Sequence, residues 1–250
     1  MTIRKVLVLF IAGAVGIASM LPFLPTLVSI TGEELPIPLI ALQAVYFVQS
    51  GVLLLIAIGI GMWLAPKVRL ATPILDSLLD RDRATKIPAN TLIALVIGGI
   101  VGGVMIVTFY QLMMPYLPVT FLEQAESFKL PFYARLLYGG FTEEILIRWG
   151  LMSFFAWVLF RLFGRGQNQP TSLIYLISIL LSALLFGLGH LPVANLLAGS
   201  LTSSLVFYIV FANSIFGFIA GFLFWKYGLE AAVSAHIIVH IVILTSELMM

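Results

Sequence analysis

The stretch from Phe141 to Gly150, FTEEILIRWG, places two adjacent carboxylates and an arginine inside an otherwise apolar helical pattern. It is preceded by KLPFYARLLYGG and followed by LMSFFAWVLF, so Glu143 and Glu144 lie deep in a segment that is long enough to cross a bilayer. An ionisable side chain at such a depth costs about 2.5–3.5 kcal/mol on insertion scales, and for that reason it usually marks a functional site. The stretch therefore predicts a transmembrane helix that carries a polar site.

The spacing within this stretch predicts an ion pair. Glu144 and Arg148 are four residues apart, so they meet on one face of a helix, and in hydrocarbon their pairing removes much of the cost of burying each charge. Glu143 points about 100° away around the helix, so the same arginine cannot satisfy both carboxylates equally well. Taken alone, the three residues are also compatible with a purely structural ion-pair cluster that holds helices together.

The histidines favour a catalytic interpretation. The chain has three, His190, His236 and His240, and all lie in apolar segments of the C-terminal half. Phe186 precedes His190 by one helical turn, while His236 and His240 are four residues apart and therefore face the same way. One buried histidine is commonly a structural residue. Three of them, together with an unpaired buried carboxylate, indicate a candidate active site.

Composition determines the class of the fold. Of the 250 residues, 61% are hydrophobic and 10% charged, and the mean hydropathy is +1.13. We therefore expect an all-α, polytopic transmembrane helix bundle of seven to eight spans, because backbone polar groups in lipid must be satisfied within helices. The apolar runs are continuous rather than alternating, which excludes a transmembrane barrel. The net charge of +2 does not suggest a nucleic-acid partner, and the absence of cysteine excludes thiol chemistry and disulfides.

The N-terminal part, residues 1–131, is expected to form about three spans. The first has a short basic start and is kinked by prolines at 22 and 25; because no convincing cleavage context follows, we expect it to be retained rather than removed as a signal peptide. Residues 66–90 form the one long polar stretch, rich in lysine and arginine, so the positive-inside rule predicts a cytoplasmic loop there and a cytoplasmic N-terminus in a multi-pass cell-membrane protein. Four glycines between 98 and 103 predict a smooth face for close helix packing.

The number of spans after residue 171 depends on one segment. Residues 172–191 and 229–248 each read as a single span. The segment between them, 192–228, can cross once or twice, giving seven or eight spans in all. We favour one crossing, because it leaves Lys226 on the cytoplasmic side.

Three motifs in this half of the chain resemble those of a known family. E-E-x-x-x-R is matched by Glu143, Glu144 and Arg148, F-x-x-x-H by Phe186 and His190, and the start of H-x-x-x-N/D by His236. This order is similar to that of the CPBP family, which comprises CAAX prenyl proteases and bacteriocin-processing enzymes and is also called the Abi family. The resemblance extends over about residues 132–248. The sequence departs from the pattern at His240, where the family usually has asparagine or aspartate.

The resemblance implies an intramembrane glutamate endopeptidase whose catalytic helix core is residues 132–250. Glu143 and His190 are then expected to hold and activate a water, and His236 with the residue at 240 to stabilise the oxyanion. Because Glu144 is held ionised by Arg148, Glu143 is the better general base. The substrate is expected to be a prenylated CAAX-type protein or another membrane-associated peptide, with membrane lipid as the surroundings and no cofactor. The oligomeric state cannot be read from these residues.

Two other classes of function remain open at this point. Two histidines four residues apart, with a third histidine and a carboxylate on nearby helices, also make an acceptable first shell for zinc, as in a membrane metalloprotease. Four protein ligands would, however, leave no position for a water. The second class is a membrane partner without catalytic activity, such as an immunity or scaffold protein or a proton carrier. A serine mechanism is weaker, because neither Ser182 nor Ser234 has a suitable context.

Overall fold

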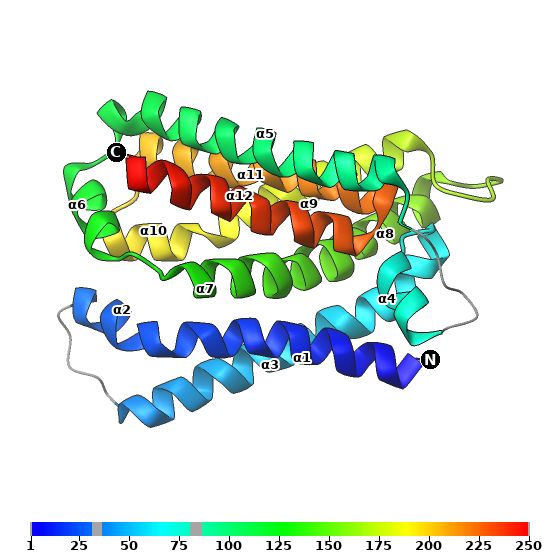
Figure 1. Cartoon of the computed structure of the whole chain (residues 1–250), viewed down its shortest axis with the longest axis horizontal. Coiled ribbons are helices and arrows are strands. Elements are labelled where there is room, and N and C mark those ends of the chain that lie inside the picture. The colour runs from blue at the N-terminus through cyan, green and yellow to red at the C-terminus, as the bar shows by residue number, and fades with distance from the viewer. Residues whose placement is uncertain (1, 32–36, 81–86, 250) are drawn as a thin grey trace.

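The computed structural model describes residues 2–31, 37–80 and 87–249, and these residues form helices and no strands. Figure 1 shows the helices lying side by side as an elongated bundle, with α5, α11 and α12 together on one side and α1 and α3 on the other. Seven stretches of the described chain are long and apolar enough to cross a membrane. The expected all-α bundle is therefore confirmed, at the lower end of the predicted number of spans.

The helical elements occur in the following order along the chain. They are α1 (Thr2–Met20), η1 (Leu21–Phe23), α2 (Leu24–Thr31), α3 (Leu39–Leu64), η2 (Ala65–Val68), α4 (Pro73–Leu79), α5 (Ala89–Met113), η4 (Met114–Tyr116), α6 (Val119–Ser127), α7 (Phe132–Ala134), η5 (Arg135–Glu143), η6 (Ile145–Met152), α8 (Ser153–Phe163), α9 (Ser172–Gly189), α10 (Leu191–Ala198), α11 (Ser203–Tyr227) and α12 (Leu229–Met249).

Two expectations about the spans can be compared directly with the structure. The first span is interrupted by the short 3-10 turn η1 between α1 and α2, at the prolines that predicted a kink. The segment from 192 to 228 contains the short helix α10 and the single long helix α11, so one crossing of this segment gives seven candidate spans. Part of the polar loop predicted at 66–90, residues 81–86, lies outside the described residues.

The glutamate-bearing span, residues 132–163, is not a regular α-helix. Two stretches of π-helix, η5 and η6, follow each other with only Glu144 between them, and α7 and α8 continue the span on either side. In a π-helix the backbone bonds join residues five apart, so more residues occupy each turn than in an α-helix. Such helices are rare and frequently occur at functional sites. Here the π-form places Tyr138, five residues before Glu143, on the same side as that carboxylate.

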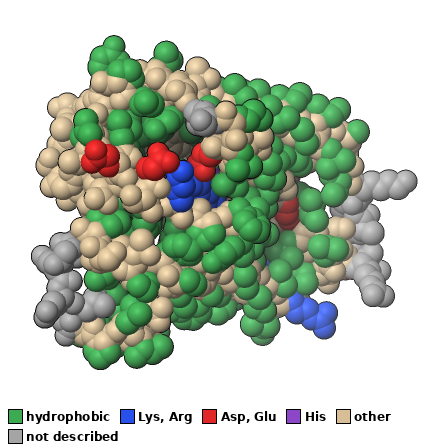
Figure 2. Space-filling model, turned by 60° about the vertical axis from the view of Figure 1, so that its left-hand side comes forward, with side chains coloured by type: hydrophobic (Ala, Val, Ile, Leu, Met, Phe, Trp, Pro, Cys, Tyr) green, Lys and Arg blue, Asp and Glu red, His purple; other side chains and the backbone are tan. Residues whose placement is uncertain are grey.

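Figure 2 shows that hydrophobic side chains cover much of the surface, while most of the acidic and basic side chains in this view lie together in one band. This distribution suits a bundle surrounded by lipid, because exposed apolar surface is favourable in hydrocarbon. Charged pairs in the described residues include Lys129 with Glu126 at 2.8 Å and Arg135 with Glu247 at 2.6 Å. The hydrogen bond between Lys129 and Glu126 lowers the pKa of Glu126 and raises the pKa of Lys129.

The glycines of α5 allow it to pack closely against α12, as their spacing predicted. A Cβ atom at Gly99 would lie 2.6 Å from the Cβ of Ile238, and one at Gly103 would lie 2.7 Å from the Cβ of Val242. Since α12 carries two of the three histidines, this contact fixes the helix that supplies them.

We predict that Gly99→Leu strongly destabilises the protein, because its side chain would overlap Ile238 and the carbonyl oxygen of Ala235, 2.9 Å from the Cβ position. Overpacking of this kind costs about 1–3 kcal/mol or more. The matched control is Gly59→Leu on α3, where no atom lies within 4 Å of the Cβ position. Thermal unfolding in detergent should show a lower Tm for the first variant only; equal Tm values would contradict the close packing.

Candidate active site

The predicted site residues come from three parts of the fold. Glu143 is the last residue of η5, Arg148 lies on η6, and Glu144 joins the two. His190 lies between α9 and α10, and both His236 and His240 lie on α12. The structure brings both glutamates, the arginine and the first two histidines into contact. His240 lies beside them, stacked on His236.

Glu144 is at the centre of this arrangement. Its side chain is fully buried, with no exposed surface, and its Oε1 atom accepts a hydrogen bond of 2.8 Å from Nδ1 of His236. Its Oε2 atom lies 3.3 Å from Nε of Arg148, so the ion pair predicted from their spacing is present. Because Nδ1 of His236 donates to the carboxylate, Nε2 is the nitrogen that faces the rest of the site.

Arg148 is fully buried and is held mainly by charge. Its pairing with Glu144 lacks the alignment of a hydrogen bond, and the guanidinium N–H groups have no hydrogen-bond acceptor among the described residues. The guanidinium instead lies over the ring of Phe186, at 5.3 Å from the ring centroid. Such a cation–π contact partly compensates for the lost solvation of the charge.

Glu143 lies between two imidazoles. Its Oε1 atom is 3.8 Å from Nε2 of His190, and its Oε2 atom is 3.8 Å from Nε2 of His236. Both distances exceed that of a direct hydrogen bond. The side chain retains 17% exposure, in contrast to the buried Glu144. Glu143 is therefore the carboxylate that small polar molecules can reach.

His190 is oriented by the helix that precedes it. Its Nδ1 atom lies 2.8 Å from the carbonyl oxygen of Phe186, to which it donates, and its ring meets the Phe186 ring edge-on at 4.7 Å. In the neutral imidazole this leaves Nε2 as an acceptor, directed towards Glu143. Phe186 therefore contributes a carbonyl oxygen as well as an aromatic ring that contacts His190 and Arg148.

His240 occupies the position at which the sequence departs from the family pattern. Its ring stacks on that of His236, with centroids 4.9 Å apart and planes inclined by 17°. A Cβ atom at Gly139 would lie 2.5 Å from Nε2 of His240 and 3.2 Å from Nε2 of His236, so only glycine leaves room for both imidazoles. Gly140, by contrast, packs against Ile237. Nδ1 of His240 is buried without a partner among the described residues.

Two tyrosines next to Glu143 were not anticipated from the sequence. The phenol groups of Tyr46, on α3, and Tyr138, on η5, interact with each other and with the charge of Glu143. A spacing of five residues between Tyr138 and Glu143 carries no signal unless the helix is known to be a π-helix. Tyr46 is distant in sequence and belongs to no motif shared with Glu143, so nothing in the sequence links the two residues.

The same geometry bears on the zinc alternative. In the parts of the chain that the structure describes, no three side chains of histidine, cysteine, aspartate or glutamate are arranged to hold a metal ion. Nδ1 of His190 and Nδ1 of His236 already donate to Phe186 and Glu144. Both bonds leave Nε2 of the imidazole directed at Glu143, an orientation that histidines also adopt when they ligate a metal ion.

Fold and site together define a multi-pass helical membrane protein with a buried site of carboxylates and imidazoles. Residues 126–242 match the family model described as type II CAAX prenyl endopeptidase, Rce1-like. This region includes all six predicted site residues, and its resemblance to the CPBP family is confirmed. No match was found among curated proteins or among solved structures.

We predict that Arg148→Met strongly destabilises the protein, because it removes the cation beside the buried Glu144 carboxylate and leaves only the hydrogen bond from His236. Breaking a buried pair in this way costs about 3–5 kcal/mol. The control is Arg135→Met, whose pair with Glu247 is partly exposed (15% and 33%) and is expected to cost less than about 1 kcal/mol. Unfolding by SDS in mixed micelles measures both. Similar losses would show that the buried pair has no special role in stability.

Proposed function

We propose that this protein is an intramembrane endopeptidase that hydrolyses a peptide bond with a water activated by Glu143 and His190. The observation that supports this most directly is the position of Glu143. One of its oxygens lies 3.8 Å from Nε2 of His190, and the other lies 3.8 Å from Nε2 of His236. Contacts of this length between polar groups are typical places for a bridging water. The peptidase family of residues 126–242 is consistent with that chemistry.

The proposed first step is attack of the water on the substrate carbonyl carbon. The water donates one hydrogen bond to Glu143 and one to Nε2 of His190, which leaves an oxygen lone pair free to attack. Glu143 takes the proton as the C–O bond forms and later transfers it to the leaving amine. Glu144 cannot take this role, because both its oxygens are engaged, by His236 and Arg148.

The negative charge that develops on the carbonyl oxygen requires positioned donors. Nε2 of His236 can donate when the imidazole is also protonated at Nδ1, the nitrogen bonded to Glu144. His240 is proposed as the second donor, through Nε2 beside Gly139.

The path of α12 supports an opening of the site towards the cytoplasm. The backbone N–H of Leu229, where α12 begins, donates to the carbonyl oxygen of Ala71, in the basic connection after α3. His236 lies seven residues further on, which is about 10 Å along a helix. Under the positive-inside rule this end of the bundle is cytoplasmic. The proposed substrates are prenylated CAAX-type proteins or other membrane-associated peptides, cleaved by residues 132–250 without a metal.

The function is tested with a fluorogenic prenylated peptide and protein purified in detergent. Glu143→Gln is expected to lower kcat by about 10²–10⁴-fold, because it removes the general base while keeping the size of the side chain. Glu123→Gln, which removes an exposed carboxylate on α6, is the control and should cleave normally. Activity of the native protein should persist in a strong zinc chelator.

Each alternative has its own outcome in this experiment. Loss of activity with the chelator, restored by zinc, would establish the metalloprotease and overturn the glutamate mechanism. Full activity of Glu143→Gln would exclude this residue as the base. If the folded native protein cleaves no member of a library of prenylated and unprenylated peptides, the scaffold or immunity function takes the place of the peptidase.

The departure at His240 gives a separate prediction. His240→Leu should lower kcat by about 10²–10³-fold if His240 donates to the oxyanion, because it removes one donor. His240→Asn, which restores the residue usual in the family, should retain most of the activity, since its amide N–H can replace the imidazole N–H. Equal kcat values for the leucine variant and the native protein would show that His240 only packs against His236.

A further inference from the structure

A second polar feature lies at the end of the bundle that carries the basic connections. It is a shallow, open cavity of about 530 Å³, a depression of the surface, between the segment after η2 and the loop that joins α8 to α9. In Figure 1 this loop projects at the same end as α4 and the N-terminus. The cavity is lined by Arg69, Gln167, Asn168, Gln169, Pro170 and Thr171.

The cavity is distinct from the proposed active site. It lies at the start of α9, whereas His190 directly follows the last residue of that helix. Eighteen residues of α-helix span about 27 Å, so the two sites are at opposite ends of α9. Occupancy of the cavity therefore involves none of the residues proposed for peptide hydrolysis.

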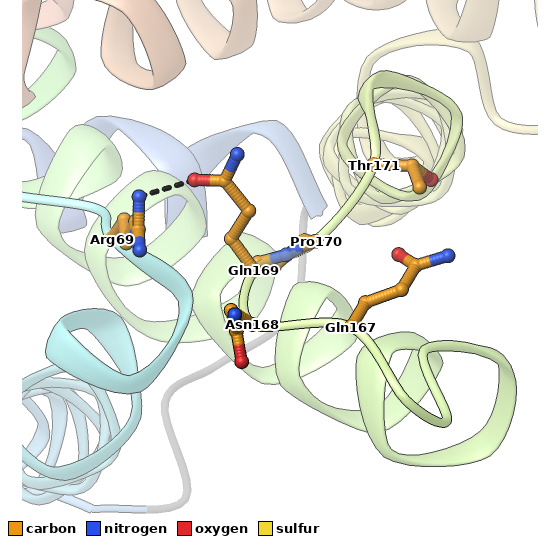
Figure 3. Close-up of a pocket in the computed structure, with 6 residues that line it drawn as sticks. All are labelled: Arg69, Gln167, Asn168, Gln169, Pro170 and Thr171. Atoms are coloured by element: carbon orange, nitrogen blue, oxygen red, sulfur yellow. Dashed lines mark hydrogen bonds between the residues drawn. The ribbon is translucent and has the colours of Figure 1, made fainter.

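The side chains that line the cavity are suited to an anion. They comprise one guanidinium, three primary amides and a hydroxyl, and no carboxylate. Figure 3 shows the side chain of Gln169 turned towards Arg69, whose Nη1 donates to the Gln169 Oε1 atom. This contact orients the guanidinium and leaves its other N–H groups available. Thr171 accepts the N–H of Ile174, so its own hydroxyl proton also remains available.

The backbone turns sharply at Arg69, where η2 ends. Among the described residues, Arg69 is the one non-glycine residue with a positive φ, of 53°. This left-handed conformation is that of a helix C-cap: Arg69 ends η2, and its backbone N–H donates to the carbonyl oxygens of Ala65 and Pro66. It places the guanidinium at the cavity.

Aromatic and basic residues mark this end of the bundle as a membrane boundary. Lys67 lies over the ring of Trp63 at 3.9 Å, and Lys226 lies over the ring of Trp225 at 3.5 Å. Tryptophan is typical of the lipid headgroup region, and basic residues beside it attract anionic lipids of the cytoplasmic leaflet. The cavity thus opens where phospholipid headgroups lie.

We propose that this cavity binds the phosphate group of an anionic phospholipid, with Arg69 as its charged ligand. Arginine matches phosphate because its planar N–H groups donate in pairs to two oxygens. Gln169 orients the guanidinium, whereas Figure 3 shows the Gln167 amide turned away from Arg69. The volume suits a headgroup, since small-molecule sites in proteins typically measure about 300–1,000 Å³.

The test uses the full-length protein in phosphatidylcholine vesicles that contain spin-labelled phosphatidylglycerol. The association of this lipid with the protein, relative to spin-labelled phosphatidylcholine, is measured by electron paramagnetic resonance. Arg69→Gln removes the charged ligand, and Gln169→Glu places a carboxylate in the cavity. The control is Arg165→Gln, which removes the same charge from the same loop but from a residue that does not line the cavity. Helix content and Tm verify that each variant is folded.

We expect the native protein to prefer phosphatidylglycerol over phosphatidylcholine. Both cavity variants should reduce this preference at least about fivefold, because one basic residue at a membrane surface contributes about that factor. Arg165→Gln should reduce it clearly less. Equal losses in Arg69→Gln and Arg165→Gln would overturn the proposal in favour of a diffuse surface charge. Calorimetric binding of inorganic phosphate to the native protein, with no preference for the lipid, would overturn the lipid as the occupant.

Discussion

The structure depends most on the buried contact of Glu144 with Arg148 and His236. A carboxylate without exposed surface inside a membrane bundle is tolerable only when neighbouring groups compensate its charge, here Arg148 at 3.3 Å and the hydrogen bond from His236. The arginine comes from the same helical span, whereas the histidine comes from α12, 92 residues further along the chain. One side chain therefore ties the glutamate-bearing span to α12 and presents Nε2 of His236 to Glu143.

The N-terminal spans hold the glutamate-bearing span from the other side, through contacts too close for any residue but glycine. Gly16 on α1 faces the carbonyl oxygen of Leu137, and Gly61 on α3 faces the ring of Trp149. The hydroxyl of Thr142, the residue before Glu143, donates to the carbonyl oxygen of Gly13 at 2.8 Å. The first spans thus fix the backbone directly before Glu143, although the proposed catalytic residues all lie further along the chain.

Much of this arrangement could be predicted from the sequence because it depends on local periodicity. The spans follow from apolar runs of bilayer length, the pair of Glu144 and Arg148 from a spacing of four, and the stacked imidazoles of His236 and His240 from the same spacing. The rest depends on contacts between distant segments. Three features leave no periodic signal in the sequence. They are the π-form of η5 and η6, the approach of Tyr46 to Glu143, and the pairing of Glu144 with His236 rather than with His190.

The central claim is that Glu144 fixes the proton of His236 on Nδ1 and thereby directs Nε2 at Glu143. Nitrogen-15 NMR of the histidine-labelled protein in lipid bilayers tests this most directly, with His236→Asn used to assign the signals. We predict a His236 signal with a protonated Nδ1 in a strong hydrogen bond, altered in Glu144→Gln and unchanged in Glu123→Gln. A His236 imidazole protonated on Nε2 alone would contradict the claim, because Nδ1 would then have no proton to donate to Glu144.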